Sequence, residues 1–266
     1  MRKKAFAIIF MTVCLTASLL SGCKKKYQEV DLSSHTTEAP QPETTVPPTA
    51  APTTAAPQPT TAAAPAYVQA SIETYTDGDI KIAYPVVTGL SDATKQNNLN
   101  AQLKENALSI IDAYGLKEKE GSADISCKVI TINRGAVCVT YDGLVNVKGA
   151  AYPSNVFYAN TVNIETLKNM GFSDYADPFT QAGYVLSSDV KLRSGDQELR
   201  NAFLQYRDQS FTAEQLTDMF KNADFPVNGE FPESFSYSKD GDLFYSVPVP
   251  HALGDYVIIA FSLEGK

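Results

Sequence analysis

The chain has 266 residues, 44% of them hydrophobic, and a formal net charge of −8 at pH 7. This size and composition are sufficient for a folded domain with an apolar core. The acidic balance argues against a nucleic-acid partner, since phosphate groups would be repelled, and it fits either a cationic partner or a surface that is acidic for solubility alone.

The first 22 residues have the parts of a bacterial export signal. Basic residues at positions 2–4 precede an apolar run over residues 5–19, which is shorter than the ~20 residues of a membrane-spanning helix. The next four residues, which resemble the cleavage box of bacterial lipoproteins, are Leu20, Ser21, Gly22 and Cys23. We predict that residues 1–22 are removed and that Cys23 is lipidated, which places the chain on the outer face of the cell membrane. The alternative is a transmembrane anchor with an incidental cysteine.

Residues 23–66 alternate proline with threonine and alanine. Such a composition cannot bury a core, so the segment is predicted to be a disordered tether. A diacylglyceryl group on Cys23 would supply two acyl chains, which anchor stably because each buried methylene contributes ~0.8 kcal/mol. The membrane is therefore the first predicted partner.

Residues 67–266 are predicted to form one extracytoplasmic domain, with a possible internal boundary near 116–123. Strands are expected over residues 67–75 and 79–84, on either side of a turn. A helix follows, with Ser91 or Asp92 as its N-cap and Gly115 as its stop. Its buried face is predicted by apolar residues at three- and four-residue steps, namely Leu99, Leu103, Ala107, Ile110, Ile111 and Tyr114.

The remainder of the domain reads as strands, then helices, then strands. A hairpin is expected over residues 125–132 and 136–141, followed by strands over 144–147 and 156–164. Helices are predicted after Asp177-Pro178, over 197–206, and after a capping box that begins at Thr212. The closing strands are 235–237, 243–247 and 256–263. This segregated order predicts an α+β fold with a mainly antiparallel sheet and packed helices.

Two cysteines fall in the predicted domain, Cys127 and Cys138. If the hairpin turns at residues 133–134, they are diagonal neighbours on one face, ~7–8 Å apart at Cα, which is long for a disulfide. We expect two free buried thiols. A disulfide remains the alternative, because the predicted compartment is oxidising.

The domain carries no motif of a known catalytic or metal site. His251 is its only histidine, and the spacings of zinc ligands, hydrolase elbows and phosphate-binding loops are absent from the sequence. We therefore predict no enzymatic activity, no metal and no cofactor. The acids Asp174, Asp177, Asp240, Asp242 and Asp255 could form a glycosidase pair only if the fold brought two of them together.

Three stretches resemble an extracytoplasmic domain family shared by the extracellular part of the lysozyme-sensing anti-sigma factor and the N-terminal part of a peptidoglycan deacetylase. They are residues 80–90, 149–153 and 249–256. The middle stretch departs from the family's Gly-Gly-Ala-His, with Ala150 and Tyr152 at its second and fourth positions. The resemblance implies an α+β fold and, for one branch, lysozyme as a partner.

The candidate binding residues lie in the loops that these stretches contain: Tyr152, Pro153, Pro250, His251 and Asp255. Residues 67–266 hold 26 acidic and 16 basic residues, a formal charge of −10. We therefore expect a surface-anchored binding domain for a cationic protein such as lysozyme, or for a cell-wall polymer. The alternatives are an accessory lipoprotein without a ligand of its own and a peptidoglycan-active enzyme.

Overall fold

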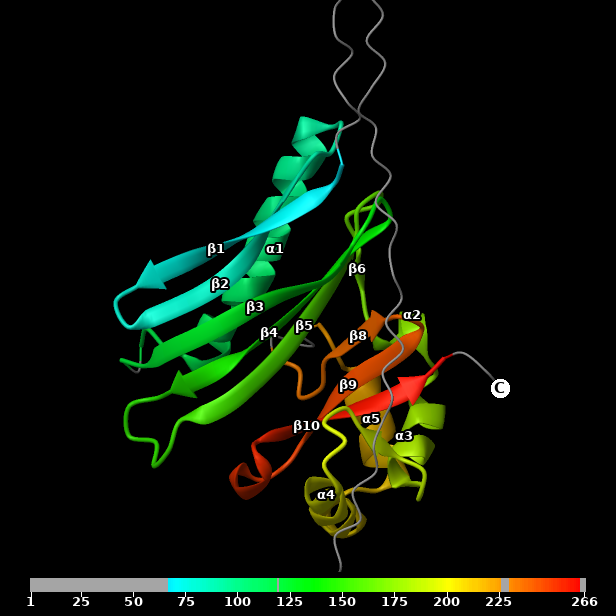
Figure 1. Cartoon of the computed structure of the whole chain (residues 1–266). Coiled ribbons are helices and arrows are strands. Elements are labelled where there is room, and N and C mark those ends of the chain that lie inside the picture. Colours follow the sequence, from blue (N-terminus) through cyan, green and yellow to red (C-terminus); the bar gives the residue numbers. More distant parts are fainter. Residues whose placement is uncertain (1–66, 119, 226–229, 264–266) are drawn as a thin grey trace, which may run out of the picture. The chain divides into compact units, whose positions relative to one another are not determined.

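The computed structural model describes residues 67–118, 120–225 and 230–263. The predicted signal peptide, Cys23 with its cleavage box, and the predicted tether lie outside the described residues. The described part has the predicted α+β fold, with two sheets and several helices (Figure 1). Its elements in the first half are β1 (Gln69–Asp77), β2 (Ile80–Thr88), α1 (Ala93–Tyr114), β3 (Ser122–Ile132), β4 (Ala136–Asn146) and β5 (Ser154–Asn163). Those of the second half are β6 (Asn169–Met170), α2 (Phe172–Tyr175), α3 (Pro178–Leu186), β7 (Lys191–Leu192), α4 (Gln197–Ser210), α5 (Ala213–Lys221), β8 (Ser236–Lys239), β9 (Asp242–Pro248), η1 (His251–Leu253) and β10 (Tyr256–Ser262).

The larger sheet, sheet A, has the strand order β1-β2-β3-β4-β5-β6. All neighbours are antiparallel except β2 and β3, which run parallel. The parallel pair needs a crossover connection, and α1 supplies it. The possible internal boundary near residues 116–123 therefore falls where α1 connects to β3, and β3 belongs to the same sheet as β1 and β2.

Helix α1 covers one face of sheet A (Figure 1). The predicted caps are confirmed, because the Asp92 carboxylate accepts from Lys95 N and Gly115 ends the helix with φ 58°. The apolar stripe from Leu99 to Ile111 is buried, as its spacing predicted. A buried hydrogen bond of 2.7 Å from Tyr158 Oη to the Ala107 carbonyl ties the helix to β5.

The smaller sheet, sheet B, has the order β7-β10-β9-β8 and is antiparallel throughout. Side chains of β9 alternate between two hydrophobic clusters, as the two-residue period of a strand requires. Leu243, Tyr245 and Val247 pack in a cluster with residues of α3, α4 and α5. Phe244, between them, packs instead with the core of sheet A and stacks on Tyr237. Sheet B thus lies between helices α3, α4 and α5 on one side and sheet A on the other.

The register of the β3–β4 hairpin differs from the expected one. A bulge between Val129 and Thr131 shifts the pairing, so that Cys127 lies opposite Tyr141 and Cys138 opposite Thr131. Residues opposite one another share a face, so the two cysteines lie on opposite faces of sheet A. The expectation of diagonal neighbours was therefore wrong, and both thiols are free. Burial raises the pKa of Cys127 to about 12 and that of Cys138 to about 11, the latter against weaker opposing hydrogen bonds.

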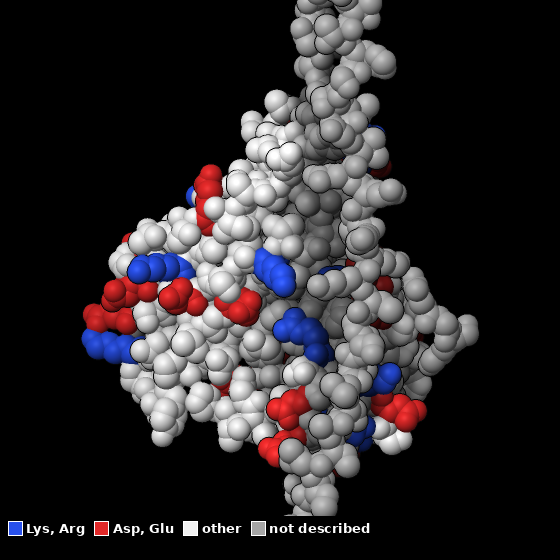
Figure 2. Space-filling model, in the orientation of Figure 1, with Lys and Arg blue, Asp and Glu red and all other residues white. Residues whose placement is uncertain are grey.

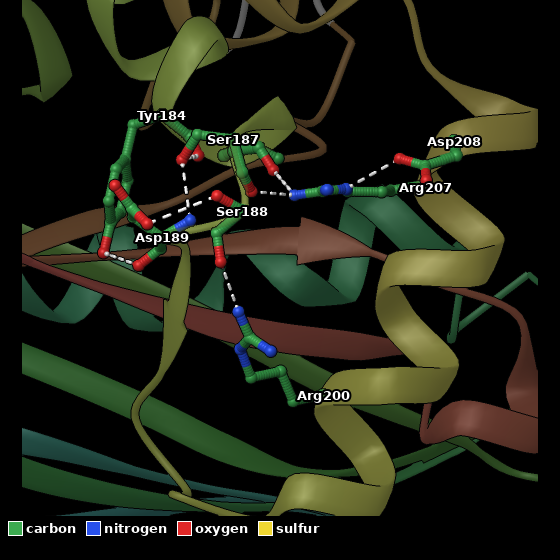
Figure 3. A network of polar contacts seen from close by, with 8 residues as sticks. Tyr184, Ser187, Ser188, Asp189, Arg200, Arg207 and Asp208 are labelled. Atoms are coloured by element: carbon green, nitrogen blue, oxygen red, sulfur yellow. Dashed lines mark hydrogen bonds and ion pairs between the residues drawn. The ribbon is translucent and has the colours of Figure 1, made fainter.

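The C-terminal end of α3 is held by two arginines of α4 (Figure 3). The buried Arg207 guanidinium donates to the carbonyls of Val185 and Ser187, the latter at 2.7 Å, and pairs with Asp208. Arg200 donates to the carbonyls of Ser188 and Val190. The last carbonyls of a helix have no partner within it, so Arg207 supplies the donor for the Val185 and Ser187 carbonyls at the end of α3. Arg200 holds the segment that follows the helix.

No helix within the described ranges is both long enough and apolar enough to cross a membrane.

Replacing Arg207 with methionine should lower the free energy of unfolding by roughly 2–3 kcal/mol, because methionine fills the space but leaves the α3 carbonyls without a donor. Urea unfolding followed by circular dichroism measures the loss. Lys221→Met is the matched control: its pair with Asp218 is exposed, so it should cost no more than about 1 kcal/mol. Equal losses in the two variants would contradict a capping role for Arg207.

Candidate functional site

Two loops that are far apart in the sequence meet at the surface. The β4–β5 loop carries Tyr152, and the β9–β10 connection carries His251 within η1. The two rings are stacked, with centroids 5.5 Å apart and planes inclined by 13°. These loops contain two of the three stretches that carry the family resemblance, so the fold brings together candidate residues that the sequence could only name separately.

Asp255 positions this pair. Its carboxylate lies 3.0 and 3.1 Å from His251 Nδ1 and accepts from the backbone N (2.8 Å) and side-chain Nδ2 (3.0 Å) of Asn155. Asn155 belongs to β5, three residues after Tyr152. One carboxylate therefore connects the histidine to the strand that follows the tyrosine loop.

The charge state of Asp255 follows from its surroundings. Partial burial raises its pKa, but the hydrogen bonds from Asn155 and His251 lower it more, and the net shift is downward. An ionised carboxylate only accepts hydrogen bonds, so His251 Nδ1 must carry the proton that lies between them. Nε2 is then the ring nitrogen that remains for a ligand.

The backbone of the connection is shaped for this contact. Gly254 ends η1 with φ 97°, and Asp255 follows with φ 70°. A left-handed conformation is tolerated best by glycine and, among other residues, by asparagine and aspartate. The two residues turn the chain into β10 and place the carboxylate against β5.

The candidate residues around Asp255 are accessible. Tyr152 is 68% exposed, and Pro153, Pro250 and His251 are also exposed. Large exposed aromatic side chains are enriched at protein interfaces, where they contribute much of the binding energy. The cluster of Tyr152, Pro153, Pro250, His251 and Asp255, with Asn155 as its support, is called the Tyr152–His251 site below.

A cavity of about 410 Å³ adjoins this site and shares Asn155 and Asp255 with it. Aromatic side chains from α1, β5 and the 231–235 segment form part of its wall, among them Tyr114, Phe157 and Phe231. Glu233 and Asp255 are its acidic residues. An apolar wall with two carboxylates suits the long side chain of a lysine or arginine, whose stem is apolar and whose end is charged.

The other candidate acids do not gather at the Tyr152–His251 site. Asp177 caps α3 and Asp174 accepts from Gly171 N. Asp240 and Asp242 lie at the turn between β8 and β9. Within the described ranges, no His, Cys, Asp and Glu side chains group so as to hold a metal ion, and His251 hydrogen bonds to no hydroxyl or thiol. The prediction that the chain is not an enzyme stays a prediction.

The sequence analysis missed two residues, Asn155 in this site and Asp224 elsewhere in the domain. Asn155 gave no signal because its role depends on a partner 100 positions away. Asp224 is a buried acid outside the site, and its carboxylate accepts from Phe172 N, Ser236 N and Ser236 Oγ. Burial raises its pKa to about 7, against the lowering effect of these hydrogen bonds.

The sequence matches no protein-family model and no curated protein. Its fold is similar to two solved structures of DUF3298 family proteins. The one from Bacteroides fragilis is 14% identical over 73% of this chain and 88% of that chain, with a TM-score of 0.36. The one from Pseudomonas aeruginosa is 12% identical over 75% of this chain and 89% of that chain, with a TM-score of 0.37. Likeness at this level carries no argument about activity or partner.

The stability of the domain should fall as pH rises from 4 to 7 through Asp224. In the unfolded chain this group ionises near its ordinary pKa of 3.8, whereas in the folded chain it stays protonated until about pH 7. Its contribution is therefore complete below pH 4 and lost by pH 7, a change of up to about 4 kcal/mol.

Urea unfolding of the wild type and Asp224→Asn at pH 4.5 and 7.5 tests this. Since asparagine does not ionise, the variant should gain stability relative to the wild type as pH rises. An identical difference at both pH values would show that Asp224 does not titrate in this range.

Proposed function

We propose that this chain is an envelope lipoprotein whose domain binds a cationic protein through the Tyr152–His251 site, with lysozyme as the first candidate. The observation that supports this is the convergence of two exposed loops on one carboxylate. Rigid aromatic anchors next to fixed charges are typical of protein-binding surfaces. The expected lipid anchor and the lysozyme-sensing branch of the resembled family are consistent with the same role.

The charge of the domain agrees with such a partner. Residues 67–266 carry a formal charge of −10, and lysozyme is basic. Acidic side chains, interspersed with lysines, gather on the face in Figure 2 at the end of sheet A where β1 turns into β2. Some of them are already paired there, as Lys117 with Asp77 at 3.0 Å. Long-range attraction would therefore mainly raise the association rate, and contacts at the site would determine the dissociation rate.

The carboxylates beside the site give the proposal a specific contact. Asp255 is held ionised by its hydrogen bonds, and Glu233 lies on the same cavity wall. A lysine or arginine that enters the cavity would meet both charges, while Tyr152 and His251 would pack on the surface around it. Partly buried charge pairs of this kind contribute more than exposed ones.

Tyr152→Ala should weaken binding to immobilised lysozyme at least about tenfold, because truncation of a central aromatic anchor typically costs 2 kcal/mol or more. Surface plasmon resonance with the purified chain measures the affinity at low and moderate salt. Phe179→Ala is the matched control, since Phe179 is also 68% exposed but belongs to α3.

Two results would reject the proposal. If the wild-type chain is not retained on lysozyme at either salt concentration, lysozyme is excluded as the partner. Equal affinities for the wild type and Tyr152→Ala, with lysozyme bound, remove the Tyr152–His251 site as the binding surface.

Cys23→Ala should abolish fatty acylation, because no second lipidation site is predicted. Metabolic labelling with an alkyne fatty acid measures the loss. Cys14→Ala is the control, since that cysteine lies in the predicted signal peptide and its loss should leave labelling of the mature chain intact. Labelling that persists in Cys23→Ala would contradict lipidation at this position.

A further inference from the structure

A second cavity, of about 580 Å³, lies between α1, β5, β6 and the 231–235 segment. Its volume is within the range of small-molecule sites, about 300–1,000 Å³. Its lining includes the amide side chains of Asn106, Asn160 and Asn169 and the aromatic side chains of Tyr158, Phe231 and Phe235. The cavity includes neither Tyr152 nor His251.

The amides form a chain of hydrogen bonds between α1 and the strands. Asn106 Nδ2 donates to Asn160 Oδ1 (2.7 Å), and Asn160 Nδ2 donates to Asn169 Oδ1 (3.2 Å). Asn169 Oδ1 also accepts from Gln102 Nε2 at 2.8 Å. Asn160 is only 7% exposed. Its hydrogen bonds offset the desolvation of its amide and fix the orientation of the neighbouring amides.

The hydrogen bonds between these amides leave some of their polar groups free for a ligand. An asparagine side chain has two donors and two acceptor lone pairs. Both lone pairs of Asn169 Oδ1 are used, but among the described residues its Nδ2 group donates to none. Asn106 Oδ1 is likewise an acceptor that no described residue uses. Asn169 therefore has a donor, and Asn106 an acceptor, to offer a ligand in the cavity that both residues line.

The aromatic side chains of the lining supply an apolar surface. Tyr158, Phe231 and Phe235 contact one another with ring centroids 5.2 to 6.2 Å apart and tilted or edge-on planes. Tyr158 is buried and bonded to α1 through its hydroxyl, so this surface is rigid. Aromatic surfaces of this kind pack against flat ligands that have an apolar face.

The ligand that matches both parts of the lining is uncharged and carries an amide. Lys168 borders the cavity together with two carboxyl groups, Glu105 and Asp224, and burial keeps Asp224 protonated up to about pH 7. The lining therefore carries little net charge near neutral pH and favours no ion. The acetamido group of an N-acetylated amino sugar has one N–H and one C=O, which complement Asn106 Oδ1 and Asn169 Nδ2. The sugar ring has an apolar C–H face for the aromatic surface and hydroxyls for the remaining amides.

We propose that the amide-lined cavity between α1 and β5 binds N-acetylated amino sugars. This site differs from the Tyr152–His251 site in its amide side chains and its neutral ligand, although Phe231 and Phe235 also line the cavity of about 410 Å³ beside that site. Asp224 borders the cavity as well, but its carboxyl is already occupied by the hydrogen bonds from Phe172 and Ser236, so it is a structural group here and not a catalytic acid.

The test is saturation-transfer difference NMR of the purified full chain with the β-1,4-linked trimer of N-acetylglucosamine. We expect saturation of the acetyl methyl signals and a dissociation constant of about 1 mM or lower. The de-N-acetylated trimer, which lacks the amide, should bind at least about tenfold more weakly.

Asn169→Asp is the decisive variant. It keeps the oxygen that accepts from Gln102 and Asn160, so the chain of amides can persist, but it removes the Nδ2 donors. It should weaken binding of the acetylated trimer at least about tenfold, whereas Asn146→Ala, at an exposed asparagine of β4, should bind like the wild type. Circular dichroism of each variant confirms that it is folded.

The proposal would be overturned by any of these results: absence of binding up to about 5 mM trimer, equal binding of the de-N-acetylated trimer, tighter binding of an acetylated dipeptide than of the sugar, or unchanged affinity in Asn169→Asp. Loss of sugar binding in Tyr152→Ala would assign the sugar to the Tyr152–His251 site instead. If the protein binds the sugar but has no affinity for lysozyme, the result supports this site and rejects the proposed function.

Discussion

The Asp255 carboxylate is the contact on which the candidate site depends. It joins β5 of sheet A, through Asn155, to the β9–β10 connection of sheet B, through His251. The tyrosine loop connects strands of sheet A and the histidine loop connects strands of sheet B, so this carboxylate supplies a polar bond between the two sheets. The hydrogen bond from Val249 N to the carbonyl of Asp255 closes the same connection from the backbone side. The geometry of the site is thus fixed by a residue that contributes little exposed surface of its own.

That contact is effective because the two sheets already share a core. Phe235 and Ile258 of the sheet B region are buried in the cluster that sheet A forms with α1. Phe157 of β5 contacts both Tyr237 and Tyr256 across the junction. A single carboxylate could not hold two independent layers, since an exposed polar contact contributes only about 1 kcal/mol. Apolar packing sets the distance between the sheets, and Asp255 then determines which loop residues meet.

Local signals in the sequence predicted local structure well. Asp92, Gly115 and the capping box at Thr212 each act within one helix, and the structure places the ends of α1 and α5 where they indicated. The β3–β4 register was missed because the turn is longer than the expected two residues, so that Ile132 pairs with Val137, and because the bulge after Val129 shifts the pairing again. The division into two sheets could not be read either, since a strand pattern shows which residues alternate and not which sheet they join.

The two candidate sites differ in how much of each could be predicted from the sequence. The loops of the Tyr152–His251 site were found through a family resemblance, while their contact depends on the packing of sheet on sheet. The amide cavity left no trace in the sequence, because Gln102 and Asn106 lie on a helix and Asn160 and Asn169 on strands. On α1 the two positions are four residues apart, a spacing that an exposed polar face also has. Only the position of α1 against β5 turns them into one continuous set of hydrogen bonds.

Asp224 and Asp255 have the same backbone arrangement but differ in burial, and this difference gives the two carboxyl groups different roles. Each has φ 70° and each accepts from a backbone N–H of another element. Asp255 keeps contact with solvent, so its hydrogen bonds prevail and it stays ionised at neutral pH, where a charged ligand can use it. Asp224 lies among apolar groups, so desolvation prevails and its charge changes near neutral pH. The first residue can serve recognition because its charge is constant there, whereas the second joins α2, α5 and β8 at a point where protonation and packing are coupled.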